Sequence, residues 1–225
     1  MKAWPLMLAI VPLLSPEPPR PTARVTACAV AIAIDVRAPL AWGRTEWHLF
    51  TREVERTWAS YGVTFCWVEG PAFAKATAGK PDSCEGLEVR VRVSIADDVP
   101  SLDTTAAKPS LGRIRFRDGE PLGEIELSLA AARRLSAQAR LGDRPMADWP
   151  RIVAASVLPR VLGRGLAHEI GHFLLRSPEH AATGLMAAGF TPEDVVWGSA
   201  SRFTLSKASA LAVGSECTAR RMAAR

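Results

Sequence analysis

The long apolar segment 151–175 contains two histidines and a glutamate at a spacing that suits a helix. His168 and His172 are four residues apart, so on an α-helix they project from the same face, one turn apart. Glu169 follows the first histidine and lies beside that face, and apolar flanks on both sides are typical of a buried helix. Pro159 interrupts the segment and predicts a kink or a division into two helices. The rest of the fold has to be arranged around this helix.

Two imidazoles on one helix face can bind a single metal ion, and the sequence offers a third. Ser177 and Pro178 predict the end of the helix, because a proline disfavours helical geometry at the preceding residue. The chain can then turn back and bring His180 to the same ion. Three protein ligands with an open fourth position are typical of a catalytic zinc site. The alternative is that these are ordinary core or surface histidines.

A carboxylate is the rival for the third ligand position. Glu193 lies at a predicted helix start downstream, and Glu179 is adjacent to His180. Thr191 could instead cap the downstream helix, in which case Glu193 would only favour the first turn. We expect His180 to be the ligand.

Glu169 stands where a general base can act on a water bound to the metal. Zinc lowers the pKa of such a water and polarises a substrate carbonyl. The carboxylate would take the proton of the water and pass it to the departing amine. The expected chemistry is therefore metal-assisted hydrolysis, with Zn²⁺ as the cofactor.

The remaining chain alternates between strand and helix patterns. Helices are predicted at 44–61 and around 130–140, and strands at 25–34, 63–68, 87–95, 113–117 and 124–129. The order of strand, helix, several strands and then helices predicts an α+β domain. We expect a mixed twisted sheet, an active-site helix beneath it and a C-terminal helical subdomain.

The N-terminus has the pattern of a secretion signal. Lys2 precedes the apolar run Ala3–Leu14, which is too short to span a bilayer and is followed by a proline-rich stretch. We predict a signal peptide and leader over residues 1–22, one domain over residues 23–225, and a secreted, periplasmic or extracellular location. The alternative is a disordered tail ahead of the first strand.

Four cysteines, Cys28, Cys66, Cys84 and Cys217, are compatible with one or two disulfides in an oxidising compartment. The pairing Cys66–Cys84 is favoured because it would close the loop between two predicted strands. The alternative is that all four are reduced and buried.

The net charge of +5 comes from arginines scattered along the chain rather than clustered. No aromatic-interleaved basic motif is present, so we expect no nucleic-acid partner. No later segment is long and apolar enough for stable membrane insertion. We expect a monomer.

The H-E-x-x-H motif, a third histidine past a turn, and Met186 in the turn "GLM" together resemble the metzincin group of zinc metalloproteases. The likeness is greatest to the matrixin-type members, which have a zincin-like fold. It implies zinc ligands His168, His172 and His180, with Glu169 as the general base and Met186 beneath the metal. It also implies an edge strand within 113–129 that pairs with an extended peptide or protein substrate. The function implied is a secreted zinc metalloendopeptidase; the alternative is a non-catalytic secreted zinc-binding module with the same fold.

The sequence departs from the metzincin pattern at three places. Leu175 occupies the position of the usual glycine, and His180 comes eight residues after His172 instead of six. The connecting turn must therefore be two residues longer and differently built. The one tyrosine, Tyr61, lies far upstream, so no tyrosine follows the methionine turn to assist the transition state.

Overall fold

The computed structural model describes residues 28–36, 40, 42–69, 90–97 and 110–223 of the 225-residue chain. The predicted leader, residues 1–22, lies outside the described residues, and so does Cys84. The predicted Cys66–Cys84 pairing is therefore not tested. Cys66 and Cys217 are each disulfide-bonded.

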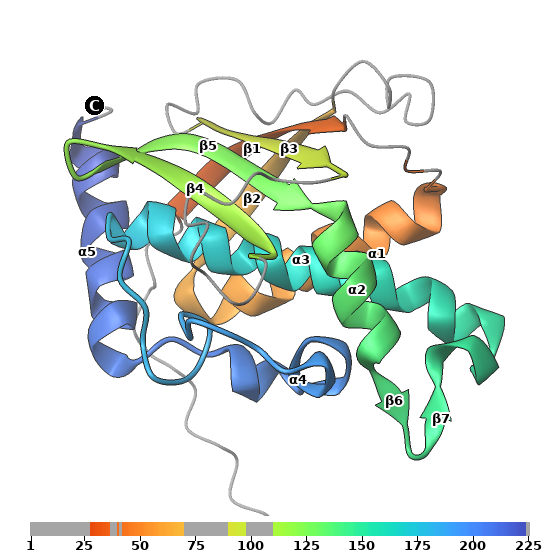
Figure 1. The fold of residues 1–225 in the computed structure, drawn as a ribbon. Helices are drawn as coiled ribbons and strands as arrows, with labels where there is room; N and C mark the ends of the chain where they lie inside the picture. The colour runs from red at the N-terminus through yellow and green to blue at the C-terminus, as the bar shows by residue number, and fades with distance from the viewer. Residues whose placement is uncertain (1–27, 37–39, 41, 70–89, 98–109, 224–225) are drawn as a thin grey trace, which may run out of the picture.

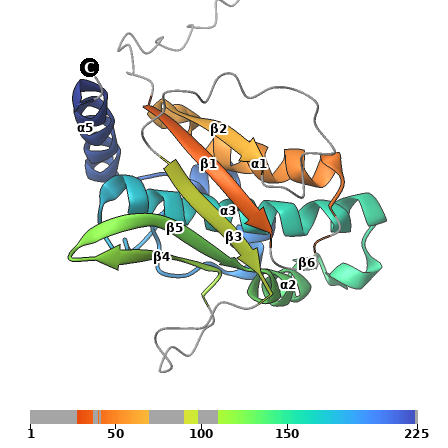
Figure 2. The same cartoon turned by 90° about the horizontal axis from the view of Figure 1, so that it is seen from above.

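A twisted sheet of five strands forms the upper layer of the molecule (Figures 1 and 2). Its order is β2-β1-β3-β5-β4, where the strands are β1 (Cys28–Val36), β2 (Val63–Glu69), β3 (Arg90–Ala96), β4 (Gly112–Arg117) and β5 (Glu120–Ser128). The first four strands in this order run parallel to one another, and β4 is antiparallel to β5. The prediction of a mixed sheet is confirmed. The antiparallel strand β4 ends the sheet among the described residues.

Helices α1 (Arg44–Trp58) and α3 (Arg151–Leu175) pack against one face of the sheet, as Figure 1 shows. Val91, Val93 and Ile95 of β3 are fully buried, whereas Arg92 between them is exposed. The apolar residues thus repeat with the period of two of a β-strand, although Ser94 on the other face is buried as well. The core therefore lies between the sheet and these two helices.

Helix α1 carries its apolar residues at the predicted helical spacing, and Phe50, Val54 and Trp58 are completely buried. A short 3-10 turn, η1 (Ala59–Tyr61), follows, and the chain reverses at Gly62 with a φ of 69°. A left-handed conformation of this kind favours glycine, because it has no Cβ to clash with the backbone. The helix predicted over 44–61 is therefore present, with a 3-10 turn as its last three residues.

Pro159 was predicted to kink the long helix or to divide it into two, and the second of these outcomes is wrong. α3 is one helix of 25 residues with Pro159 inside it. Every residue from 161 to 174 is buried, so apolar packing holds the helix on the far side of the proline. The loss of one backbone hydrogen bond at Pro159 is therefore not enough to end the helix.

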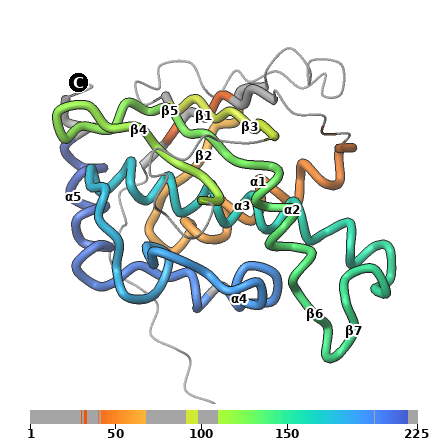
Figure 3. Tube along the Cα trace, viewed as in Figure 1, coloured from red at the N-terminus to blue at the C-terminus, as the bar shows by residue number. Residues whose placement is uncertain are grey.

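The second half of the chain adds small elements around α3. Helix α2 (Leu129–Gln138) follows β5, and a two-stranded hairpin, β6 (Arg140–Leu141) and β7 (Arg144–Pro145), leads through η2 (Met146–Asp148) into α3. After α3 come α4 (Pro192–Trp197), η3 (Ala200–Phe203) and α5 (Lys207–Ala223). Figure 3 shows the chain after α3 turning down and running beneath that helix to α4. The predicted C-terminal helical part is therefore present, and no described helix is both long and apolar enough to cross a membrane.

Candidate metal centre

His168 and His172 lie in the buried C-terminal half of α3, with ring centroids 4.7 Å apart. Their Nδ1 atoms contact backbone carbonyl oxygens: Nδ1 of His168 lies 2.7 Å from the Leu185 oxygen, and Nδ1 of His172 lies 2.7 Å from the Ser177 oxygen. A carbonyl oxygen only accepts hydrogen bonds, so each Nδ1 must carry the proton. The backbone thereby sets the tautomer of both rings and leaves both Nε2 lone pairs free.

These two free nitrogens face each other. Nε2 of His168 and Nε2 of His172 are 3.1 Å apart. Two lone pairs at that separation repel unless a proton or a cation lies between them. The pKa of His168 is lowered to about 4; burial is the largest cause, the hydrogen bond with the Leu185 carbonyl opposes it, and the neighbouring imidazoles of His172 and His180 add to the lowering. A neutral imidazole with an exposed lone pair is the form that binds a metal ion.

His180 approaches the same point from the loop that follows α3. Its ring stacks on that of His168, with centroids 5.3 Å apart and planes at 20°, and it meets the His172 ring edge-on at 4.7 Å. One ligand nitrogen from each of the three histidines can be chosen so that all lie within 4.8 Å of one another. His180 is exposed, so solvent and a substrate can reach the group from this side. The structure thus brings the three predicted histidines together.

The longer turn before His180 is built without the glycine of the metzincin pattern. The helix ends at Leu175, and Arg176 reverses the chain in the left-handed region with a φ of 52°. That conformation is unfavourable for a residue with a Cβ by about 1–2 kcal/mol. The Arg176 side chain forms ion pairs with Glu120 of β5 and Glu216 of α5, which connect the turn to both elements at the surface. The backbone N–H of Ser177 then donates to the carbonyl of His172.

A tight loop connects His180 to the methionine turn. The N–H of Ala181 donates to the carbonyl of Met186 at 2.7 Å, and the N–H of Leu185 donates to that of Thr204 at 2.9 Å. Met186 is buried, and its sulfur would lie only 2.2 Å from a Cβ placed on Gly171. Gly171 therefore allows the methionine turn to lie directly against the helix between the two histidine positions.

Glu169 lies on the side of α3 that faces β4. A Cβ placed on Gly112 would come within 3.1 Å of the Glu169 Cγ. The pKa of Glu169 is raised to about 8, because the effect of burial outweighs the opposing effect of a backbone hydrogen bond from Ile114. A bound divalent cation would favour the ionised carboxylate. The carboxyl group is thus held between the helix and the end strand of the sheet.

The rival carboxylates do not join the histidines in the part of the chain that the structure describes. Glu193 is exposed in the first turn of α4. Thr191 caps that helix, because its hydroxyl accepts a hydrogen bond of 3.1 Å from the Asp194 N–H. Glu179 is also exposed, and its N–H donates to the Ser177 hydroxyl.

The donor set fits zinc. Nitrogen ligands of a tetrahedral zinc ion lie 2.0–2.1 Å from the metal and therefore about 3.3 Å from each other. The Nε2 atoms of His168 and His172 are already 3.1 Å apart. Histidines whose second ring nitrogen donates to a carbonyl are typical metal ligands, because that bond orients the ring and raises its basicity. The three-histidine group could therefore bind zinc.

Sequence patterns did not reveal the groups that support this site. Ser177 and Leu185 act through backbone carbonyls, which no side-chain motif encodes. Arg164 is the other residue that was missed: it is a buried cation one turn before His168. A lone arginine between two glycines in an apolar run was the available signal.

Tyr61 takes no part in the site. Its hydroxyl accepts a hydrogen bond of 2.7 Å from the Leu205 N–H, and its ring packs edge-on against Trp58. It therefore connects the end of α1 to the segment before α5.

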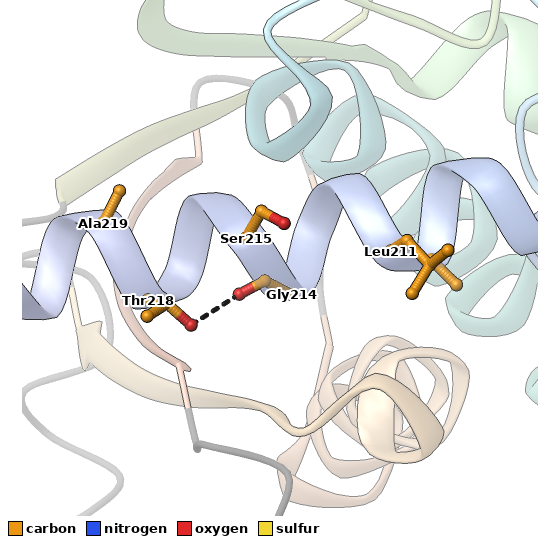
Figure 4. Close-up of a pocket in the computed structure, with 6 residues that line it drawn as sticks. Leu211, Gly214, Ser215, Thr218 and Ala219 are labelled. Carbon is orange, nitrogen blue, oxygen red and sulfur yellow. Dashed lines mark hydrogen bonds between the residues drawn. The ribbon is translucent and has the colours of Figure 1, made fainter.

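A shallow surface hollow lies elsewhere, along one face of α5 (Figure 4). Figure 4 shows that the Thr218 hydroxyl in this hollow is bonded to a carbonyl of its own helix, that of Gly214. No charged residue lines it, and no histidine does; the lining consists of Ala210, Leu211, Gly214, Ser215, Thr218 and Ala219. The hollow therefore adds nothing to the metal centre.

Comparison with known proteins gives only remote likenesses. No protein-family model matches the chain, and no curated protein gives a significant match. Archaemetzincin from Methanopyrus kandleri is similar over 88% of this chain and 99% of its own, with 15% identity and a TM-score of 0.43. A zinc-dependent peptidase from Methanocorpusculum labreanum is similar over 82% of this chain and 99% of its own, with 12% identity and a TM-score of 0.46. Likenesses at these scores carry no weight for function, which has to be inferred from the histidine group itself.

Proposed function

We propose that this chain is a zinc metalloendopeptidase. His168, His172 and His180 would hold the metal, and Glu169 would act as the general base. The observation that carries the proposal is the pair of imidazole Nε2 atoms 3.1 Å apart, each ring oriented by a carbonyl at its Nδ1. A buried pair of this kind is suited to a cation, because either a proton or a metal must separate the two lone pairs.

Zinc, when bound, would polarise a substrate carbonyl and make a water molecule more acidic. Glu169 would accept a proton from the attacking water and donate it to the departing amine. Its burial and its contact with β4 keep the carboxyl group in one place, as a general base requires.

Strand β4 supports a peptide as the substrate. It is the antiparallel end strand of the described sheet, and it runs beside Glu169 at Gly112 and Ile114. An extended peptide can pair with such a strand through backbone hydrogen bonds, independently of its side chains. A peptide bound in this way would pass the carboxyl group of Glu169.

The proposed location is outside the cytoplasm. The apolar run Ala3–Leu14 after Lys2 is one support. The disulfide-bonded state of Cys66 and Cys217 is the other, since such bonds persist in oxidising compartments. We also propose that the enzyme acts as a monomer.

The test is zinc analysis of the purified full chain combined with cleavage of a fluorogenic peptide library. Glu169→Gln should keep one zinc per chain and lose about 10²- to 10⁴-fold in hydrolysis rate, the range typical of a general base. His172→Ala should lose both zinc and hydrolysis. A chelator should abolish cleavage, and added zinc should restore it.

Two results would count against the proposal. A wild-type chain that binds no zinc would refute the metal centre. A zinc-loaded chain that cleaves no peptide in the library would favour a non-catalytic zinc-binding module.

A further inference from the structure

Arg164 is a charged side chain in the middle of the core. It lies on α3 four positions before His168, and only 2% of it is exposed. A buried guanidinium is unfavourable unless nearly all of its donors are hydrogen-bonded. Its partners therefore show what it holds together.

Three hydrogen bonds join Arg164 to two other helices. Its Nε donates to the Glu53 carboxylate of α1 at 2.6 Å. Its Nη1 and Nη2 donate to the carbonyls of Asp194 and Gly198, at 2.7 and 2.6 Å. These carbonyls lie in α4 and at its C-terminal end. A six-residue helix is too short to be stable alone, so its position depends on such contacts.

The face of the same guanidinium packs on an aromatic ring. The Arg164 Cζ lies 4.4 Å from the centroid of Phe203. The Phe203 ring packs on that of Phe190, with centroids 5.2 Å apart, and Phe190 meets His168 edge-on at 5.8 Å. A continuous series of rings thus runs from Arg164 to a histidine of the metal centre.

A second connection reaches the same histidine through the backbone. Thr204, which follows Phe203, accepts a hydrogen bond of 2.9 Å from the N–H of Leu185. The carbonyl of Leu185 in turn bonds Nδ1 of His168 at 2.7 Å. The segment Phe203–Thr204, which Arg164 contacts, therefore supports His168 in two ways. One is the ring contact through Phe190, and the other is the hydrogen bond between Nδ1 and the Leu185 carbonyl.

We infer that Arg164 is a positioning residue for the metal centre, which orients His168 by holding α4 and Phe203 in place. This inference rests on the proposed zinc site. Lysine could not replace arginine here, because a single ammonium group cannot reach a carboxylate and two carbonyls in the planar arrangement of a guanidinium. It also cannot stack flat on the Phe203 ring.

The test compares metal binding in Arg164→Lys with a matched control, Arg160→Lys. Arg160 lies one turn earlier on α3 and donates to α4 as well, to the carbonyl of Val196 at 2.9 Å. The readouts are the visible absorption spectrum of bound Co²⁺, the Zn²⁺ dissociation constant, and thermal unfolding of the metal-free chain. Arg164→Lys should alter the Co²⁺ spectrum and weaken Zn²⁺ binding about tenfold, as loss of an outer support of a ligand does. Arg160→Lys should bind both metals as the wild type does, because one ammonium group can still donate to the single Val196 carbonyl and so keep this contact with α4.

A second variant, Phe203→Leu, tests the same connection without removing a buried charge. It should change the Co²⁺ spectrum in the same way, and its effect should not add to that of Arg164→Lys in the double variant. If both variants unfold at lower temperature but bind Co²⁺ and Zn²⁺ as the wild type does, Arg164 is only a structural residue and the inference is overturned. If Arg164→Lys does not fold, the spectrum of Phe203→Leu decides alone. A wild-type chain without metal affinity would instead overturn the proposed function.

Discussion

Replacement of Gly171 by alanine sets two effects of known size against each other. Alanine in the interior of a helix is more favourable than glycine by about 1 kcal/mol. At this position, however, the new Cβ would lie 2.2 Å from the Met186 sulfur. The sulfur would have to move by about 1.5 Å to reach an ordinary contact of about 3.5–4.0 Å. Overpacking of this kind typically costs about 1–3 kcal/mol, so we expect Gly171→Ala to lose about 1 kcal/mol net.

The displacement should also reach the metal centre. The Met186 carbonyl accepts the hydrogen bond from Ala181, the residue after His180. The carbonyl of Leu185, the residue before the methionine, accepts the hydrogen bond from Nδ1 of His168. We therefore expect zinc affinity to fall by about 10- to 100-fold, the range for lost ligand supports.

The assay is thermal unfolding of the metal-free chain together with a zinc competition titration. A net loss of about 1 kcal/mol should lower Tm by about 2–4 °C in a chain of this size. Gly214→Ala in α5 is the control, because nothing lies within 4 Å of a Cβ placed there. It should raise stability by about 0.5–1 kcal/mol. If Gly171→Ala stabilises the chain as Gly214→Ala does and leaves zinc affinity unchanged, the contact with Met186 does not constrain the site.

Three further predictions follow from the same contacts. Zinc at 100 times its Kd should raise the free energy of unfolding by about 2.7 kcal/mol, as measured by thermal unfolding with and without a chelator. His180→Ala should reduce this gain strongly, whereas Glu193→Gln should not. Thr191→Ala should cost about 1 kcal/mol through loss of the α4 cap and leave zinc content unchanged, which unfolding and metal analysis can check. Gly112→Ala should lower the rate of peptide hydrolysis while zinc stays bound, because its Cβ would crowd the Cγ of Glu169 at 3.1 Å; an equal rate in wild type and variant would contradict this.

Local periodicity was sufficient to predict most elements. The spacing of Phe50, Val54 and Trp58 predicted α1, and alternation predicted β3, since burial of one face imposes a period of 3.6 or 2 on any sequence. The joint position of His168 and His172 was predicted for the same reason, because helix geometry determines it.

Sequence reasoning failed where the outcome depended on distant contacts. Pro159 predicted a kink or a division into two helices, and the division does not occur, because packing around the buried half of α3 outweighs the lost hydrogen bond. The hydrogen bond between His168 and the Leu185 carbonyl could not be predicted from the sequence, because every residue has a backbone carbonyl. Only the fold determines which of them lies next to the ring. The role of Arg164 depends on partners about 30 and 111 residues away in the chain.

By itself, the sequence determined most of the helices and strands, and it determined that His168 and His172 lie one turn apart on the same helix face. These features follow from spacings of a few residues. Only the tertiary structure decided how His180 reaches the other two. That position follows from the left-handed turn at Arg176 and from the contact of Met186 with the helix. These contacts join separate elements, and their geometry exists only when the whole domain has packed.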